Sequence, residues 1–150
     1  MKKVIIYTVL IAVAIILSLI FSVPVVNDRI AYGVMNELKK TPLPQNTVLC
    51  DSLSMAGKLN GNGNGMQYFG AILIRSDLNI EELNNFYEQY RKNEWSYVVE
   101  EQCNTEISIV EHYTLEFSFL SNINEIEKYF IVYSWGESTY PLSGLDLRGH

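Results

Sequence analysis

The first pattern along the chain is a long apolar run without charge. No charged residue lies between Lys3 and Asp28, and residues 4–26 are almost wholly Val, Ile, Leu, Ala and Phe. At about 1.5 Å per residue in a helix, such a run spans a hydrocarbon core of about 30 Å. Residues 4–26 are therefore predicted to cross a lipid bilayer as one helix.

The flanks of this run predict its orientation. Lys2 and Lys3 precede it, and positively charged flanks stay in the cytoplasm. We expect residues 1–26 to form a cytoplasmic tip and transmembrane anchor in the cell membrane, with the rest of the chain extracytoplasmic. The alternative is a cleaved secretory signal, which needs an apolar core of only about 7–15 residues and a small-x-small cleavage site. Ser18 and Ser22 do not supply that site, so an uncleaved anchor is favoured.

Helical spacing continues after the anchor. Apolar residues recur at i, i+4 and i+8 at Ile30, Ala31, Val34, Met35 and Leu38. Asn27 and Asp28 are expected to cap this helix, and Pro42 to end it. Residues 27–46 are thus predicted to be a membrane-proximal helix and a Pro-containing linker, followed by an exported domain at 47–150.

Alternating apolar and polar positions predict most strands of that domain, and a run that is largely apolar on both faces predicts a central strand at 66–74. They are expected at residues 47–59, 66–74, 95–99, 107–119 and 129–135. Only Glu111 interrupts the fourth of them, and a bulge is predicted there. Residues 78–92 have one apolar face, and Asn79 with Glu82 makes a capping-box pair, which predicts a helix. The predicted fold is α+β, a mostly antiparallel sheet of about five strands with one helix packed on a face.

The charge balance narrows the choice of partner. The chain carries a net charge of −6, and all 17 acidic residues follow the anchor. Nucleic acid is not expected as a partner, because neutralising phosphates needs clustered Lys and Arg. The acidity is explained by the solubility of the exported surface, with a basic partner as the alternative.

A run of three Asn-Gly pairs separates the first two predicted strands. It consists of Asn60, Gly61, Asn62, Gly63, Asn64 and Gly65. Asn-Gly predicts a hairpin because both residues tolerate positive φ. The glycine spacing fits neither a phosphate-binding loop nor a dinucleotide fingerprint. An exposed β-turn is predicted. The alternative is a recognition loop whose amides bind a sugar, a peptide or a neighbouring protein, and it is our preferred functional region.

Aromatic residues late in the chain provide a second set of candidates. Most of them are expected in the core. If Trp135 and Tyr140 instead flank an open groove, they would form a binding platform beside the C-terminal tail, with Arg148 contributing a charge.

The residues needed for metal or covalent chemistry lack the usual spacing. Cys50, Cys103, His112 and His150 form no metal-ligand motif, and no nucleophile elbow occurs. We therefore expect no metal and no cofactor. Cys50 and Cys103 either form a disulfide in an oxidising compartment or remain buried free thiols, and both alternatives stay open.

The segments Gly57–Gly70 and Asp146–His150 resemble small, single-pass, uncharacterised envelope proteins of Gram-positive bacteria. The layout from Thr47 to Trp135 is similar to α+β domains of small bacterial lipoproteins, although the lipid-accepting Cys is lacking. The resemblance implies location and fold, and no characteristic activity.

These observations lead to one main functional expectation. We expect a membrane-tethered, extracytoplasmic binding or interaction domain without enzymatic activity. It contacts the bilayer through residues 4–26 and binds another envelope protein or a ligand through its Asn-Gly loop and the neighbouring sheet edge. One alternative is an envelope hydrolase or transferase that uses Asp146, Arg148 and His150 with an acid such as Glu111 or Glu116. A further alternative is an immunity or inhibitor protein.

Overall fold

The computed structural model describes residues 2–61, 63, 65–119 and 127–150. The helices and strands follow the order α1 (Lys2–Lys40), β1 (Thr47–Gly57), β2 (Gln67–Ser76), α2 (Ile80–Glu88), β3 (Ser96–Glu101) and β4 (Tyr129–Glu137), and two short 3-10 helices, η2 (Ser143–Leu145) and η3 (Leu147–Gly149), end the chain. The strands form one antiparallel sheet in the order β1-β2-β4-β3. The predicted α+β class is confirmed, with four strands in this sheet rather than five.

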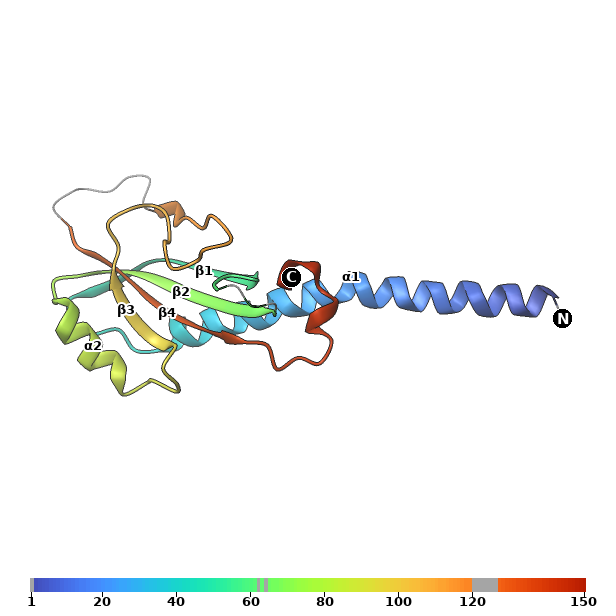
Figure 1. Cartoon of the computed structure of the whole chain (residues 1–150). Coiled ribbons are helices and arrows are strands. Elements are labelled where there is room, and N and C mark those ends of the chain that lie inside the picture. Colours follow the sequence, from blue (N-terminus) through green and yellow to red (C-terminus); the bar gives the residue numbers. More distant parts are fainter. Residues whose placement is uncertain (1, 62, 64, 120–126) are drawn as a thin grey trace.

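Helix α1 has two halves with different surroundings. Its N-terminal half projects away from the rest of the chain (Figure 1), and its apolar side chains are exposed. This half is long and apolar enough to span a membrane. In the second half, the side chains buried against the domain are spaced three or four residues apart at Val23, Asn27, Ala31, Met35 and Leu38. One helix therefore contributes both the apolar stretch and part of the domain core.

The predicted helix cap at Asn27 and Asp28 is wrong. Helix α1 runs without interruption from Lys2 to Lys40, and Pro24 lies inside it. A proline in a helix interior removes one backbone hydrogen bond and costs about 3 kcal/mol. The helix persists because the buried stripe crosses this point, from Val23 to Leu38. Asn27 uses its side chain for contacts with distant residues instead of capping.

One face of the sheet is covered by the two helices (Figure 1). Leu38 of α1 and Leu83 and Tyr87 of α2 pack against this face in one buried cluster. The sheet contributes alternate residues, Ile72, Ile74, Phe130 and Val132. Helix α2 begins with the predicted capping box, in which Asn79 and Glu82 bind each other's backbone N–H groups.

The opposite face is covered by a segment without regular strands. The predicted strand at 107–119 and its bulge at Glu111 are wrong, because these residues form turns and the one strand-like pairing is an isolated bridge from Glu116 to Glu106. Ile107, Val110 and Phe117 of this segment bury themselves against Phe69, Leu73 and Ile131. The apolar residues that suggested a strand therefore cover the sheet instead of extending it.

Candidate binding site

The Gly-rich loop between β1 and β2 is held at both ends. Gly61 and Gly65 have φ angles of 77° and 154°, which glycine adopts without steric cost. The Gly61 N–H donates to Glu111 Oε2 at 3.0 Å, and the Gly65 N–H donates to the Gly149 carbonyl at 2.7 Å. The loop is thereby joined to the 102–119 segment and to the C-terminus. The predicted site residues Asn62 and Asn64 lie outside the described residues.

Beside this loop, two tryptophans border an open hollow of about 470 Å³. We call it the tryptophan hollow, and it is lined by Asn60, Gly61, Gln67, Trp95, Trp135, Gly136 and Glu137. The rings of Trp95 and Trp135 meet edge to face, with centroids 5.1 Å apart and planes at 82°. The backbone N–H of Trp135 donates to the backbone carbonyl of Trp95 at 2.9 Å. The β3-β4 pairing therefore fixes both indoles side by side.

Local structure explains how each part of the hollow is positioned. Trp95 precedes β3, and its N–H donates to Asn93 Oδ1 at 2.9 Å. Trp135 pairs with Phe69 of β2 in the sheet register. Gln67 Oε1 accepts from both the Leu59 and Asn60 N–H groups, at 3.0 and 2.9 Å. The loop and the sheet are thus joined at the rim of the hollow.

The chemistry of the hollow combines apolar rings with a polar edge. Trp95 is 48% exposed. Among the described residues, the buried Trp135 Nε1 has no hydrogen-bond partner. The side chains of Asn60, Gln67 and Glu137 supply amide and carboxylate groups. Aromatic walls with a few polar groups are typical of small-ligand sites.

A second group of polar residues joins the C-terminus to α1. This tail cluster consists of Asn27, Asp28, Tyr68, Asp146 and Arg148. Arg148 pairs with Asp146 and with Asp28, each at 2.8 Å. The Asn27 amide donates to Asp146 Oδ2 at 2.9 Å and accepts from the Tyr68 hydroxyl at 2.8 Å. Asn27 is fully buried, so these two bonds satisfy both ends of its amide.

Burial and hydrogen bonding oppose each other at Asp146, which is 2% exposed. Burial raises the pKa of its carboxyl, but hydrogen bonds from Arg148 and Asn27 outweigh burial and leave that pKa below its usual range. The hydrogen bond to Asp146 in turn raises the pKa of Arg148. The charges of Asp146 and Arg148 therefore neutralise each other inside the structure.

The structure places the predicted site residues in different surroundings. Asn60, Gly61 and Trp135 meet in the tryptophan hollow. Gly63 and Gly65 line an adjoining hollow with Ser143. Tyr140 is half-buried, and its N–H donates to Ser138 Oγ at 3.0 Å. Arg148 belongs to the tail cluster. The sequence pattern assigned Trp95 only to a strand, whereas β3 begins at Ser96 and the Trp95 side chain is exposed.

The residues considered for catalysis have internal partners. Glu111 accepts from the Gly61 N–H, and His150 Nε2 lies 2.8 Å from the Gly144 carbonyl oxygen. Glu116 takes part in the isolated bridge with Glu106. No group of three or more potential metal ligands occurs within the described residues.

The two cysteines are free thiols. Cys50 is half-buried on edge strand β1, and Cys103 is exposed just after β3, the opposite edge strand. Two strands separate these edges, and a disulfide needs Cα atoms within about 7 Å. Burial raises the pKa of the Cys50 thiol.

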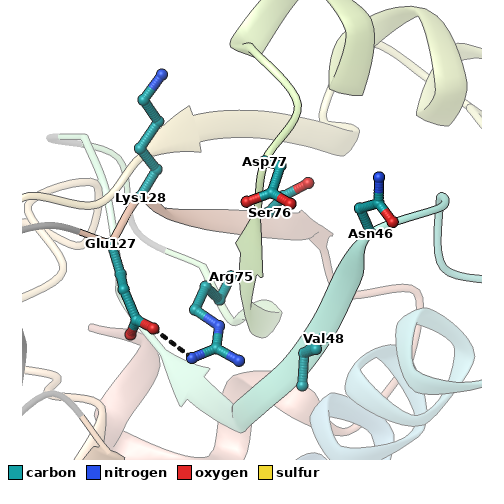
Figure 2. Close-up of a pocket in the computed structure, with 7 residues that line it drawn as sticks. All are labelled: Asn46, Val48, Arg75, Ser76, Asp77, Glu127 and Lys128. Atoms are coloured by element: carbon teal, nitrogen blue, oxygen red, sulfur yellow. Dashed lines mark hydrogen bonds and ion pairs between the residues drawn. The ribbon is translucent and has the colours of Figure 1, made fainter.

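Another hollow, of about 600 Å³, lies at the end of the sheet far from the apolar half of α1. It is lined by Asn46, Val48, Arg75, Ser76, Asp77, Glu127 and Lys128. Figure 2 shows Arg75 and Glu127 joined by an ion pair of 2.6 Å, with Lys128 extending away from it. Its acidic and basic groups balance, and it offers no aromatic ring.

In comparisons with known proteins, no family model, no curated protein and no solved structure matched the chain. A function must therefore be inferred from the structure itself, from the tryptophan hollow, the tail cluster and α1.

Proposed function

We propose that this protein is a single-pass membrane protein whose extracytoplasmic domain binds a ligand in the tryptophan hollow without catalysing a reaction. The observation that carries the proposal is the pair Trp95 and Trp135, held beside a polar loop at an open hollow. The proposed membrane location of the protein is inferred from the apolar half of α1.

Exposure of the apolar helix supports insertion into a bilayer. Side chains such as Val4, Ile11 and Phe21 are 67%, 61% and 74% exposed. An apolar surface of this length is costly in water, and a bilayer removes that cost. The positive residues Lys2 and Lys3 support a cytoplasmic N-terminus and, with it, a domain on the outer side of the cell membrane.

The packing of α1 also favours an uncleaved anchor. Val23 and Asn27 are fully buried in the domain, and the Pro24 carbonyl accepts from Arg148 at 3.1 Å. Cleavage near Ser22 would cut a helix directly next to its buried part. A signal peptide is normally separated from the folded domain by an accessible cleavage site.

The ligand chemistry is inferred from the walls of the hollow. Indole rings stack on the apolar C–H face of a sugar ring, while amide and carboxylate groups bind its hydroxyls. Trp95, Asn60 and Glu137 provide these groups together. We therefore assign the hollow to a saccharide. The paired charges of Asp146 and Arg148 favour a structural role for the tail over catalysis.

Intrinsic fluorescence tests this proposal directly, because the chain has only two tryptophans and both line the hollow. The full chain, held in nanodiscs, is titrated with oligomers of N-acetylglucosamine and of glucose. We expect a saturable change in emission with one of them, and Trp95→Ala to weaken binding at least tenfold.

Tyr32→Ala is the matched control, because Tyr32 is an aromatic residue of α1 that is 53% exposed. Its binding should equal that of the wild type. The proposal fails if millimolar saccharide leaves the emission of a folded chain unchanged, or if Trp95→Ala binds as the wild type does.

A further inference from the structure

The C-terminal turns, residues 141–150, expose three leucines. Leu142, Leu145 and Leu147 are 39%, 45% and 84% exposed. Leu147 is the most exposed large apolar side chain of the described residues. A soluble surface rarely gathers such side chains in one short segment without a partner.

The tail cluster determines where these leucines lie. Arg148 donates to the Pro24 carbonyl and pairs with Asp28, so the turns lie against α1 at residues 24–28. Figure 1 shows them at the end of the domain from which the apolar half of α1 projects. The leucines therefore lie beside the point where α1 leaves the domain.

The same point is the expected boundary of the bilayer. A helix that spans a core of about 30 Å with residues 4–26 places Pro24 and Val25 at the edge of the hydrocarbon. Phe21 and Val25 are 74% and 64% exposed on the helix there. The turns, bonded to Pro24, must then lie at the level of the lipid headgroups.

The composition of the turns suits that level. Transfer of a leucine side chain from water to the boundary between headgroups and acyl chains is favourable. An arginine at this depth keeps its charged group in the polar layer. Arg148 is already paired with Asp28 and Asp146, so its own charge is balanced within the protein.

We propose that the C-terminal turns are a second membrane contact, in which Leu145 and Leu147 insert into the lipid interface beside α1. The occupant of this apolar surface is the bilayer itself. The inference rests on the proposed membrane anchoring. It adds a second contact between the domain and the bilayer, through residues 141–150, which we call the membrane seat.

Depth measurements with spin labels test the seat on the full chain. Cys50→Ser and Cys103→Ser remove the native thiols, and single labels are attached through Leu147→Cys, Val13→Cys or Leu43→Cys. Vesicles of phosphatidylcholine and phosphatidylglycerol hold the protein. Accessibility to oxygen, which concentrates in lipid, is compared with accessibility to a water-soluble nickel chelate.

The labels at 13 and 43 are the controls for lipid and for water. Val13 lies in the middle of the apolar half, and Leu43, which is 38% exposed, lies between α1 and β1 at the far end of the domain. We expect the label at 147 to favour oxygen several-fold over the chelate, as the label at 13 does, and the label at 43 to show the reverse.

Each outcome bears on a different statement. If the label at 13 lies in lipid while the label at 147 behaves like that at 43, the membrane seat is overturned and the anchoring stands. If the label at 13 is itself in water, the anchoring fails and the seat fails with it. Leu147 is 84% exposed, so its replacement disturbs no core contact and the labelled chain keeps its fold.

Discussion

Gly70 of β2 lies so close to Met35 of α1 that a methyl group on Gly70 would come within 2.8 Å of the Met35 Cα atom. The backbone of the helix and the backbone of the strand are thus nearly in contact. Neither can yield by rotating a side chain. This close approach brings the second half of α1 onto the helix-covered face of the sheet.

The first prediction concerns this contact. Gly70→Ala should lower the free energy of unfolding by about 1–3 kcal/mol or more, because the new methyl group overlaps backbone atoms. Gly136→Ala in β4 is the control, since a methyl group there meets nothing within 4 Å. Urea unfolding in micelles, followed by tryptophan fluorescence, measures both. Equal stability of the two variants would contradict the close approach.

The second prediction concerns pH and Asp146. Its pKa in the folded chain lies below the usual value because its hydrogen bonds outweigh burial. A lowered folded pKa adds stability above the unfolded pKa, near 3.9, and that stability is lost as pH falls through the folded pKa. Asp146→Asn should therefore be less stable than the wild type at pH 7, with the difference shrinking below about pH 4.

Unfolding measured from pH 7 to pH 2 checks this dependence. Asp77→Asn is the control, because Asp77 is exposed at the opposite end of the sheet. Its profile should run parallel to that of the wild type. A constant gap between Asp146→Asn and the wild type at every pH would argue against the charge of Asp146.

The third prediction compares two buried tyrosines. The Tyr87 hydroxyl is buried with no hydrogen-bond partner among the described residues, and burial raises its pKa. Tyr87→Phe should stabilise the chain by about 1 kcal/mol, because it removes an unsatisfied polar group. The Tyr133 hydroxyl donates to Glu100 at 2.8 Å, so Tyr133→Phe should destabilise by about 1 kcal/mol. Thermal unfolding should show opposite signs, and equal signs would refute the contrast.

The fourth prediction concerns the thiols. Cys103 is exposed, whereas Cys50 is half-buried and burial raises its pKa. Because the thiolate is the reactive form, Cys103 should react with iodoacetamide at neutral pH well before Cys50. Mass spectrometry of the folded chain measures the order. Unfolding without reductant should then expose two reactive thiols, and a single disulfide-linked pair would contradict the structure.

Sequence patterns correctly predicted α2 and the four strands of the sheet, because the spacing of their apolar residues follows from burial in the core. The capping box at Asn79 and the apolar face of α2 predicted that helix. Strands β1, β2, β3 and β4 fall within a few residues of the predicted runs. The alternation at 107–119 was misleading because a covering segment also needs apolar residues that face the sheet, and Ile107, Val110 and Phe117 serve that need.

The predicted break before Asn27 shows a different limit. Asn and Asp are favoured at the start of a helix, and no local pattern reveals that Asn27 meets Asp146, 119 positions later. For the site, the Asn-Gly run and Trp135 were visible in the sequence. Their meeting with Trp95 depends on the β3-β4 pairing, which brings the two indoles together only in the folded sheet.

The unbroken course of α1 through Pro24 also sets the rotation of the domain about the axis of the apolar half of this helix. Each helical residue turns the chain by about 100° and advances it by about 1.5 Å. The number of residues between the apolar half and the domain therefore determines which side of the apolar half is aligned with the tryptophan hollow. Any helix that packs on that side of the apolar half would approach the same face of the domain.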